Sequence, residues 1–295
     1  MTHQVTIVIP ARDEAETILD VIIRAKAVVP DAEVIVVDDG SSDTTASTAR
    51  SAGARVISHP YSMGNGAAVK SGVRGARSDW VICMDGDGQH APEDIPKLLE
   101  KLEQGFHLAV GARDAHGHAN RIRRLANGLY NRLATWVVGH RVADLTSGYR
   151  AFERRRFMTI MPMLPNGFSY PTTSTIAFFR LGYPVAFVPI DVSKRTKPSG
   201  SHIRVLRDGS KFMLIIFRIA ALYSPLKVFF PTSVSFFSSG IGYYLYTFTS
   251  DGRFTNFGAL LLTTSVLIFL IGLVAEQITT LIYSSADQSD STDQM

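Results

Sequence analysis

The stretch Met84-Asp85-Gly86-Asp87-Gly88-Gln89-His90 directly follows the apolar run Trp80-Val81-Ile82-Cys83. Such a run is typical of a buried strand, so we expect the acidic motif at the strand's carboxyl end. Carboxylate and amide oxygens are ligands that Mg²⁺ or Mn²⁺ accepts, and these ions usually share substrate phosphates. For two aspartates alone, the alternative is a solvated polar turn. An EF-hand loop is excluded, because its Gly and Glu positions, counted from Asp85, hold His90 and Pro96.

Outward from this motif, short apolar runs alternate with amphipathic or capped stretches. The alternation predicts a mostly parallel sheet with helices on both faces, because its strands are apolar throughout. We expect strands at residues 5–10, 33–37, 55–57, 80–84, 108–111 and 185–189. We expect helices between them, at about residues 13–28, 43–53, 65–73 and 92–104.

Three polar clusters follow three of these strands, at residues 12–14, 38–39 and 85–89. The carboxyl ends of parallel strands meet at one edge of a sheet, where α/β proteins bind their ligands. The convergence therefore favours a site over a solvated turn. The segment Gly64-Asn65-Gly66 is interpreted as a glycine turn that starts a helix, because a P-loop needs Gly directly before Lys and Val69 precedes Lys70.

The bulk composition indicates an intracellular catalytic part and an anionic partner. The single cysteine, Cys83, excludes a disulfide framework. Residues 113–156 contain ten arginines and no lysine. Nucleic acid, phosphate groups in general and an anionic membrane surface are the alternatives for so much arginine.

The C-terminal third carries the excess of hydrophobic residues. Residues 203–222 predict an amphipathic interfacial helix, with four basic residues on one narrow face. Residues 228–250 and 255–275 contain no charged residue over 23 and 21 positions, and each is long enough to span a membrane. The short loop Asp251-Gly252-Arg253 joins them into a hairpin. Basic residues crowd the side before the first span, which predicts a cytoplasmic catalytic domain.

Taken together, the motifs resemble those of family 2 glycosyltransferases of the GT-A fold, in the group of dolichol-phosphate mannose synthase and the polyprenyl-phosphate glycosyltransferases. The resemblance covers roughly residues 5–202. Its motifs are Val8-Ile9-Pro10, Val36-Val37-Asp38-Asp39-Gly40-Ser41-Ser42-Asp43, Gly64-Asn65-Gly66-Ala67-Ala68, Asp85-Gly86-Asp87-Gly88-Gln89-His90, Gly111-Ala112-Arg113 and Thr146-Ser147-Gly148-Tyr149-Arg150.

The resemblance implies a Rossmann-like GT-A domain that transfers a sugar, with inversion, from a nucleotide-diphosphate sugar such as GDP-mannose or a UDP-hexose to a polyprenyl phosphate. It places the nucleotide sugar against Pro10, Arg12, Glu14, Val37, Asp39, Asp85, Gly86, Asp87, Gln89 and Arg195. It assigns Mg²⁺ or Mn²⁺ to Asp87 and Gln89, with Asp85 as a further ligand, and catalysis to Asp87, Arg113 and Arg195. The acceptor phosphate is assigned to Arg113, Arg123 and Arg124. The sequence departs from the family at Arg12, where an aromatic residue is common, and at His202, near the position of a family lysine.

These features predict an integral membrane protein with no nucleic-acid partner. The expected parts are a catalytic domain (1–202), an interfacial helix (203–223), a two-helix transmembrane hairpin (224–283) and an acidic, disordered cytoplasmic tail (284–295). The alternatives are a membrane-anchored glycosyltransferase with a non-lipid acceptor, a nucleotidyltransferase-like enzyme and a decayed nucleotide-sugar-binding module. Asp87 and Gln89 argue against decay, and a nucleotidyltransferase has no need of the hairpin.

Overall fold

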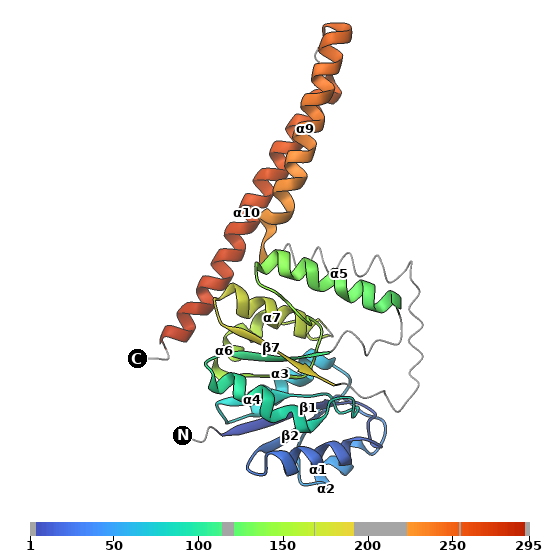
Figure 1. The fold of residues 1–295 in the computed structure, drawn as a ribbon, viewed down its shortest axis with the longest axis vertical. Helices are drawn as coiled ribbons and strands as arrows, with labels where there is room; N and C mark the ends of the chain where they lie inside the picture. Colours follow the sequence, from blue (N-terminus) through green and yellow to red (C-terminus); the bar gives the residue numbers. More distant parts are fainter. Residues whose placement is uncertain (1–3, 114–120, 168, 192–222, 254, 293–295) are drawn as a thin grey trace. The chain divides into compact units, whose positions relative to one another are not determined.

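The computed structural model describes residues 4–113, 121–167, 169–191, 223–253 and 255–292 (Figure 1). The chain divides into two compact units. One contains residues 1–201 together with 289–295, and the other contains residues 202–288.

The first unit is built on a seven-stranded sheet of order β3-β2-β1-β4-β6-β5-β7. All neighbouring strands are parallel except β6, which is antiparallel to both β4 and β5. This confirms the predicted α/β fold with a mostly parallel sheet. The strands are β1 (Val5–Ala11), β2 (Glu33–Asp38), β3 (Arg55–Ser58), β4 (Trp80–Cys83), β5 (Leu108–Arg113), β6 (Arg150–Glu153) and β7 (Val185–Ile190).

Helices cover both faces of the sheet, as the apolar strands require (Figure 1). The helices of this unit are α1 (Ile18–Val28), α2 (Thr45–Ser51), α3 (Asn65–Gly75), the short η1 (Pro92–Asp94), α4 (Ile95–Glu103), α5 (Arg121–Val138), α6 (Arg154–Ile160), the short η3 (Met161–Met163) and α7 (Tyr170–Arg180). The apolar sides of α1 and α4 share one core with the strand residues Ile7, Ile9 and Ile82. On the opposite face α3 lies so close that a Cβ at Gly72 would stand 2.2 Å from Val8 Cγ1.

The sequence analysis did not predict β6, α6 or α7. Residues 146–150 were quoted only as a motif, and the four-residue strand β6, which begins with Arg150, offers no long apolar run that would predict it. The first predicted helix also starts later than expected, at Ile18 instead of Asp13. Asp13 has a φ of 55°, which lies in the left-handed region and is incompatible with a right-handed helix at that position.

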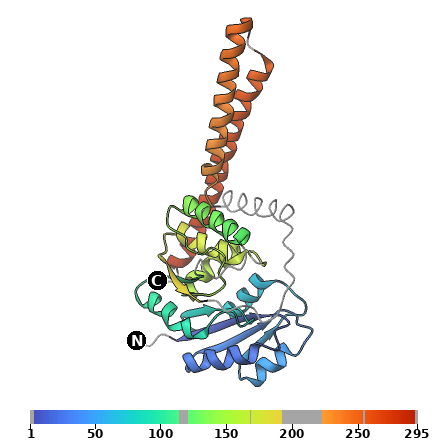
Figure 2. The same cartoon turned by 45° about the vertical axis from the view of Figure 1, so that its right-hand side comes forward.

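The second unit is a helical hairpin of α9 (Pro225–Asp251) and α10 (Asn256–Thr292), which run side by side in both ribbon views (Figure 2). α9 ends at Gly252, whose φ of 63° is the usual left-handed helix end. α10 continues to Thr292, so residues 284–292 of the tail that was expected to be disordered are helical. Small residues bring the helices close together. A Cβ at Gly272 would stand 2.5 Å from Phe229 Cβ, and the Ser233 hydroxyl donates to the Ser265 carbonyl over 2.9 Å. This is the packing that membrane helices use.

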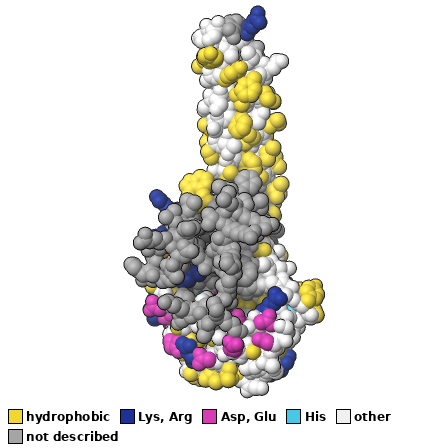
Figure 3. All heavy atoms as spheres, turned by 90° about the vertical axis from the view of Figure 1, so that its right-hand side faces the viewer, with side chains coloured by type: hydrophobic (Ala, Val, Ile, Leu, Met, Phe, Trp, Pro, Cys, Tyr) yellow, Lys and Arg dark blue, Asp and Glu magenta, His cyan; other side chains and the backbone are white. Residues whose placement is uncertain are grey.

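Only one helix in the described part of the chain is long and apolar enough to cross a membrane, where the sequence analysis expected two. It comprises residues 256–284 of α10, with a mean hydropathy of 2.5, and 17% of its most apolar stretch is buried. Figure 3 shows exposed hydrophobic side chains gathered along the hairpin. In α9 the serines, threonines, tyrosines and Pro231 lower the mean hydropathy, so its lack of charge overstated its apolar character. The predicted interfacial helix at 203–222 lies outside the described residues.

Candidate active site

The sheet brings the three predicted polar clusters to one edge. β1 lies between β2 and β4, with Ala11 paired to Asp38 and Val8 paired to Cys83. The segments that leave these strands therefore emerge next to one another. They carry residues 12–14, 38–43 and 84–90.

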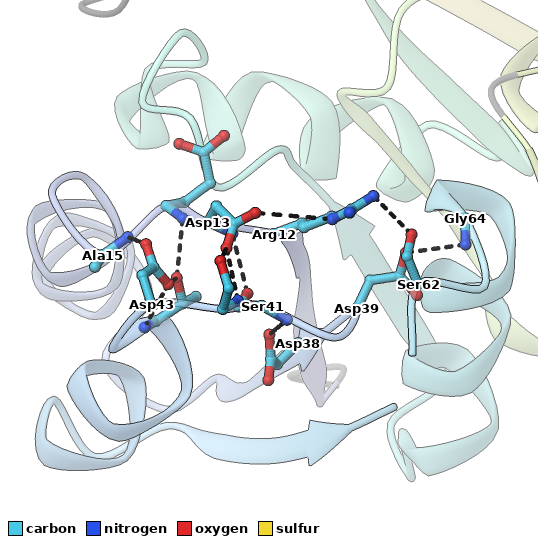
Figure 4. A network of polar contacts seen from close by, with 12 residues as sticks. Arg12, Asp13, Ala15, Asp38, Asp39, Ser41, Asp43, Ser62 and Gly64 are labelled. Atoms are coloured by element: carbon cyan, nitrogen blue, oxygen red, sulfur yellow. Dashed lines mark hydrogen bonds and ion pairs between the residues drawn. The ribbon is translucent and has the colours of Figure 1, made fainter. Parts of the chain in front are cut away.

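Asp13 joins the segments that follow β1 and β2 (Figure 4). Its Oδ1 accepts hydrogen bonds from the Ser42 backbone N–H over 2.7 Å and from the Ser42 hydroxyl over 3.0 Å. Its own N–H donates to Ser41 Oγ over 3.0 Å. These bonds from Ser42 lower the pKa of Asp13. Asp13 was predicted as part of the polar cluster at residues 12–14 but was given no role of its own, although short polar residues are the ones that tolerate a positive φ.

Asp39 organises the loop that leads into α3. Oδ1 of Asp39 lies 2.7 Å from His59 Nδ1 and accepts from the Met63 N–H, while its Oδ2 accepts from Ser62 Oγ and the Gly64 N–H. Burial raises the pKa of Asp39, but these hydrogen bonds outweigh that effect and the pKa is lowered. All four donors come from residues 59–64, so this carboxylate holds a loop in place as well as standing at the site.

Arg12 lies beside this loop, and its side chain is exposed to solvent. Its side chain is 58% exposed, and its guanidinium donates to Ser62 Oγ over 2.9 Å. Figure 4 places Arg12 between Asp13 and Ser62. Pro10 and Val37, by contrast, are buried. A methyl group at Gly72 would lie 3.2 Å from Val37 Cγ2, so the Val37 side chain faces α3 and only its backbone can face a nucleotide.

The acidic motif turns sharply after β4 and is hydrogen-bonded to the residue that precedes α1. Gly86 lies close to β1, where a Cβ would stand 3.2 Å from Ala11 Cβ, and its carbonyl accepts from Thr17 Oγ1 over 2.7 Å. Asp87 Oδ1 accepts from the Gln89 N–H over 3.1 Å. Asp87 and Gln89 are therefore held on one tight turn, and both are partly exposed.

His90, which the sequence analysis left without a role, supports Asp85. His90 Nδ1 accepts from the Asp85 N–H over 3.3 Å, and its ring stacks on Tyr149 with 5.0 Å between centroids. Burial raises the pKa of Asp85, and the positive charges of Arg113 and Arg150 oppose this effect. The carboxylate lies against Gly148, where a Cβ would stand 3.0 Å from Asp85 Oδ2.

Arg113, at the end of β5, is held by a two-point ion pair. Its Nε and NH2 donate to the Asp144 carboxylate over 2.7 and 3.1 Å, and NH2 also donates to Thr146 Oγ1 over 2.5 Å. Burial raises the pKa of Asp144, but its bonds to Arg113 outweigh this and the pKa is lowered. Asp144 was not assigned a role from the sequence.

The glycine segment before α3 is shaped by packing. A Cβ at Gly64 would stand 2.5 Å from the Asn166 carbonyl oxygen, and one at Gly66 would stand 2.3 Å from the Pro165 carbonyl oxygen. The Ala67 N–H donates to Asn166 O over 3.0 Å. The Lys70 ammonium donates to Leu164 O and Asn166 Oδ1. The backbone of residues 165–167 thus packs directly against the first residues of α3. This agrees with the prediction that the glycines form a turn before a helix and not a phosphate loop.

The oxygen atoms of the acidic motif fit a divalent cation that takes some of its ligands from the protein and the others from a substrate. Among the residues the structure describes, no group of three or more His, Cys, Asp or Glu side chains is arranged around a common metal position. Asp87 and Gln89 supply hard oxygen atoms on one turn, which suits an ion that takes its remaining ligands from phosphate and water. Arg195 lies outside the described residues, as do the side chains of Arg123 and Arg124 in α5.

A mostly parallel sheet with an acidic turn at the end of its central strand is typical of the GT-A class of glycosyltransferases. Residues 6–161 match Glycosyl transferase family 2, and residues 224–281 match the GtrB C-terminal hairpin. The chain belongs to glycosyl transferase family 2 and is a glycosyltransferase. The hairpin match agrees with the α9–α10 pair.

Several curated relatives share most of the chain. Glycosyltransferase AglJ of Haloferax volcanii is 33% identical over 82% of this chain and 80% of its own length. Polyprenol monophosphomannose synthase of Mycolicibacterium smegmatis is 30% identical over 69% of this chain and 84% of its own. Undecaprenyl-phosphate mannosyltransferase of Micrococcus luteus is 29% identical over 65% of this chain and 84% of its own.

Solved structures of glucosyl-3-phosphoglycerate synthase from Mycobacterium tuberculosis have a similar fold. The complex with Mn²⁺, UDP and glucosyl-3-phosphoglycerate is 26% identical with a TM-score of 0.58, and the match covers 74% of this chain and 79% of that one. The complex with Mg²⁺ and UDP is 27% identical with a TM-score of 0.58, over 73% and 79%. Divalent metal and nucleotide are thus bound by structural neighbours of this site.

Proposed function

We propose that this protein transfers a sugar from a nucleotide-diphosphate sugar to a polyprenyl phosphate at a membrane, giving a lipid-phosphate-linked sugar with inversion at the anomeric carbon. The observation that carries the proposal is the pairing of the acidic turn at residues 85–89 with a GtrB-type hairpin in the same chain. Relatives named as polyprenyl-phosphate mannosyltransferases support the lipid acceptor. The donor is GDP-mannose or a UDP-hexose.

The nucleotide sugar is proposed to bind along the edge formed by the ends of β1, β2 and β4. Asp39 and Glu14 would meet the nucleoside, and Arg12 is open enough to reach it. Asp85 and Gly86 would line the diphosphate. The remaining donor contacts are assigned to Pro10, Val37 and Arg195.

Asp87 and Gln89 would hold Mg²⁺ or Mn²⁺, with Asp85 nearby. The ion, when bound, neutralises negative charge on the diphosphate leaving group. The hydrogen bond from the Gln89 N–H to Asp87 Oδ1 holds residues 87–89 in a tight turn, which would keep the two side chains close enough to bind the same ion. Neutralising charge at the leaving group is the main requirement of the reaction, because the transition state concentrates charge there.

The acceptor phosphate is anionic near neutral pH, so it needs positioning more than deprotonation. Arg113 is proposed to bind it. Its Nε and NH2 are engaged by Asp144 and Thr146, which orients the guanidinium, and NH1 would be the donor to the phosphate. Arg123 and Arg124 on α5 are proposed to complete this phosphate site.

The hairpin is proposed to anchor the catalytic domain, residues 1–202, at the cytoplasmic face. With 37 residues, α10 is about 55 Å long, and the 27 residues of α9 make about 40 Å, so both exceed a ~30 Å hydrocarbon core. Residues 203–223 would lie in the membrane interface, and the tail from residue 284 would return to the cytoplasm.

The test is an acceptor competition with the purified full-length protein, Mn²⁺ or Mg²⁺, and a panel of GDP- and UDP-sugars. Short-chain polyprenyl phosphate is compared with 3-phosphoglycerate, the phosphorylated acceptor type of the structural neighbours. We expect a lipid-linked product from one donor, and its loss when EDTA removes the metal. Transfer to the water-soluble acceptor alone would replace this proposal with a non-lipid transferase.

A further inference from the structure

Arg150 is a buried cation at the centre of the first unit. It begins β6 and is paired with Cys83 of β4, two residues before Asp85. Arg150 has no exposed surface and is the largest fully buried side chain in the described part of the chain. Burying a guanidinium costs free energy unless other groups compensate for the lost water. We therefore asked which groups surround Arg150 and what its charge acts on.

The groups that hold Arg150 are neutral oxygen atoms. NH1 donates to Pro171 O over 3.1 Å, to Ser174 Oγ over 2.7 Å and, more weakly, to Thr175 Oγ1 over 3.4 Å. NH2 donates to the Ser147 carbonyl, and the Tyr170 ring lies 5.6 Å from the guanidinium carbon. The Nε atom is buried without a hydrogen-bond partner.

No carboxylate among the described residues forms an ion pair with Arg150. The nearby Asp144 is already bound at two points by Arg113, so the charges of that pair cancel. Burial lowers the pKa of Arg150, but a guanidinium is so strong a base that it stays charged near neutral pH. The positive charge of Arg150 is therefore not cancelled by a direct partner.

The position of this charge links it to the acidic motif. Arg150 fixes the Ser147 carbonyl, and the next residue, Gly148, lies against the Asp85 carboxylate. Tyr170, which stacks over Arg150, also reaches the Gly148 carbonyl with its hydroxyl, over 3.5 Å. A buried charge acts over a longer range than an exposed one because little water screens it.

We propose that Arg150 is a positioning residue of the donor site: it holds the Ser147–Gly148 backbone against Asp85 and keeps an uncancelled positive charge behind the acidic motif, which favours the diphosphate of the nucleotide sugar. This inference rests on the proposed function. Arg150 differs from a metal ligand because it does not coordinate the ion, and it differs from a surface arginine because its charge is buried. The diphosphate gains negative charge as the sugar leaves, so a fixed buried cation needs no rearrangement to stabilise it.

The experiment measures binding of GDP and GMP, and of UDP and UMP, to the full-length protein with Mn²⁺. The readout is the ratio of diphosphate to monophosphate affinity, because a purely structural defect weakens both nucleotides together. In Arg150→Gln we expect the ratio to fall about tenfold. In Arg150→Lys, which keeps the charge, we expect most of it to remain.

A second pair of variants tests the charge while leaving Arg150 in place. Ser174 Oγ accepts from Arg150 over 2.7 Å, so Ser174→Asp places a carboxylate on the guanidinium, and Ser174→Asn has the same shape without the charge. We expect the ratio to fall in Ser174→Asp relative to Ser174→Asn. Arg154→Met, which removes a bond to the Val73 carbonyl, is the control and should leave the ratio unchanged.

The outcomes separate this inference from the proposed function. An unchanged ratio in both Arg150→Gln and Ser174→Asp, with binding intact in the wild type, overturns the role of Arg150 alone. If Arg150→Gln does not fold, the Ser174 pair decides. A wild-type protein that binds neither diphosphate contradicts the proposed donor class itself.

Discussion

Asp39 shows how a sequence can predict where a residue lies without predicting which groups it contacts. Its position at the end of β2 followed from the apolar run before it. That both its oxygens bind donors from residues 59–64 did not, because a loop's return path is set by tertiary packing. The same holds for His90 and Asp144, whose partners Tyr149 and Arg113 are far away in the sequence.

Replacing Asp39 should make stability depend less on pH. The pKa of Asp39 is lower in the folded protein than its ordinary value, so its contribution is present above about pH 4 and is lost as pH falls through the folded pKa. We expect Asp39→Asn to unfold more easily than the wild type near pH 7, by about 1–3 kcal/mol. The difference should shrink below pH 4. Unfolding midpoints measured from pH 3 to 7 check this, and a constant difference would contradict it.

At the scale of elements, the start of α3 was predicted correctly from chemistry alone. The absence of Gly before Lys70 excluded a phosphate loop, and the structure gives the glycines a packing role. The partner segment, residues 165–167, lies a hundred residues further along the chain, and no local pattern in the sequence marks it. In the sequence, the close approach of two backbone segments is marked only by the glycines that permit it.

Gly66→Ala should destabilise the catalytic unit. The added Cβ would stand 2.3 Å from the Pro165 carbonyl oxygen, and a backbone atom cannot move aside as a flexible side chain does. We expect a loss of about 1–3 kcal/mol in unfolding free energy. Gly128→Ala is the matched control, because Gly128 is an exposed residue of α5 with nothing within 4 Å of its added Cβ. Equal unfolding midpoints for the two variants would exclude the steric explanation.

Gly272→Val should loosen the hairpin. The new side chain meets Phe229 of α9, whereas Gly242→Val in the same hairpin meets nothing within 4 Å of its Cβ. Membrane helices associate through close packing at small residues, so a bulky group at the contact separates them. The thermal midpoint of the protein in detergent should fall for Gly272→Val and stay near the wild-type value for Gly242→Val. A fall of the same size in both would mean that the close contact does not stabilise the hairpin.

For the whole molecule, the order of elements up to β5 and the presence of a hairpin followed from the sequence because both depend on runs of apolar residues. β6, α6 and α7 were missed, since a short antiparallel strand led by an arginine and a helix rich in buried hydroxyls carry no such pattern. Two spans were expected because residues 228–250 and 255–275 carry no charge, whereas by mean hydropathy only α10 qualifies among the described residues.

The most direct test of the account is transfer of a labelled sugar to polyprenyl phosphate by the wild type, by Asp87→Ala and by Asp31→Ala. Asp31 is an exposed aspartate in the turn before β2, so Asp31→Ala controls for the loss of a surface charge. We predict a metal-dependent lipid-linked product with the wild type and Asp31→Ala, and a loss of at least about 100-fold with Asp87→Ala. Undiminished product from Asp87→Ala, or no lipid-linked product from any nucleotide sugar, would contradict the account.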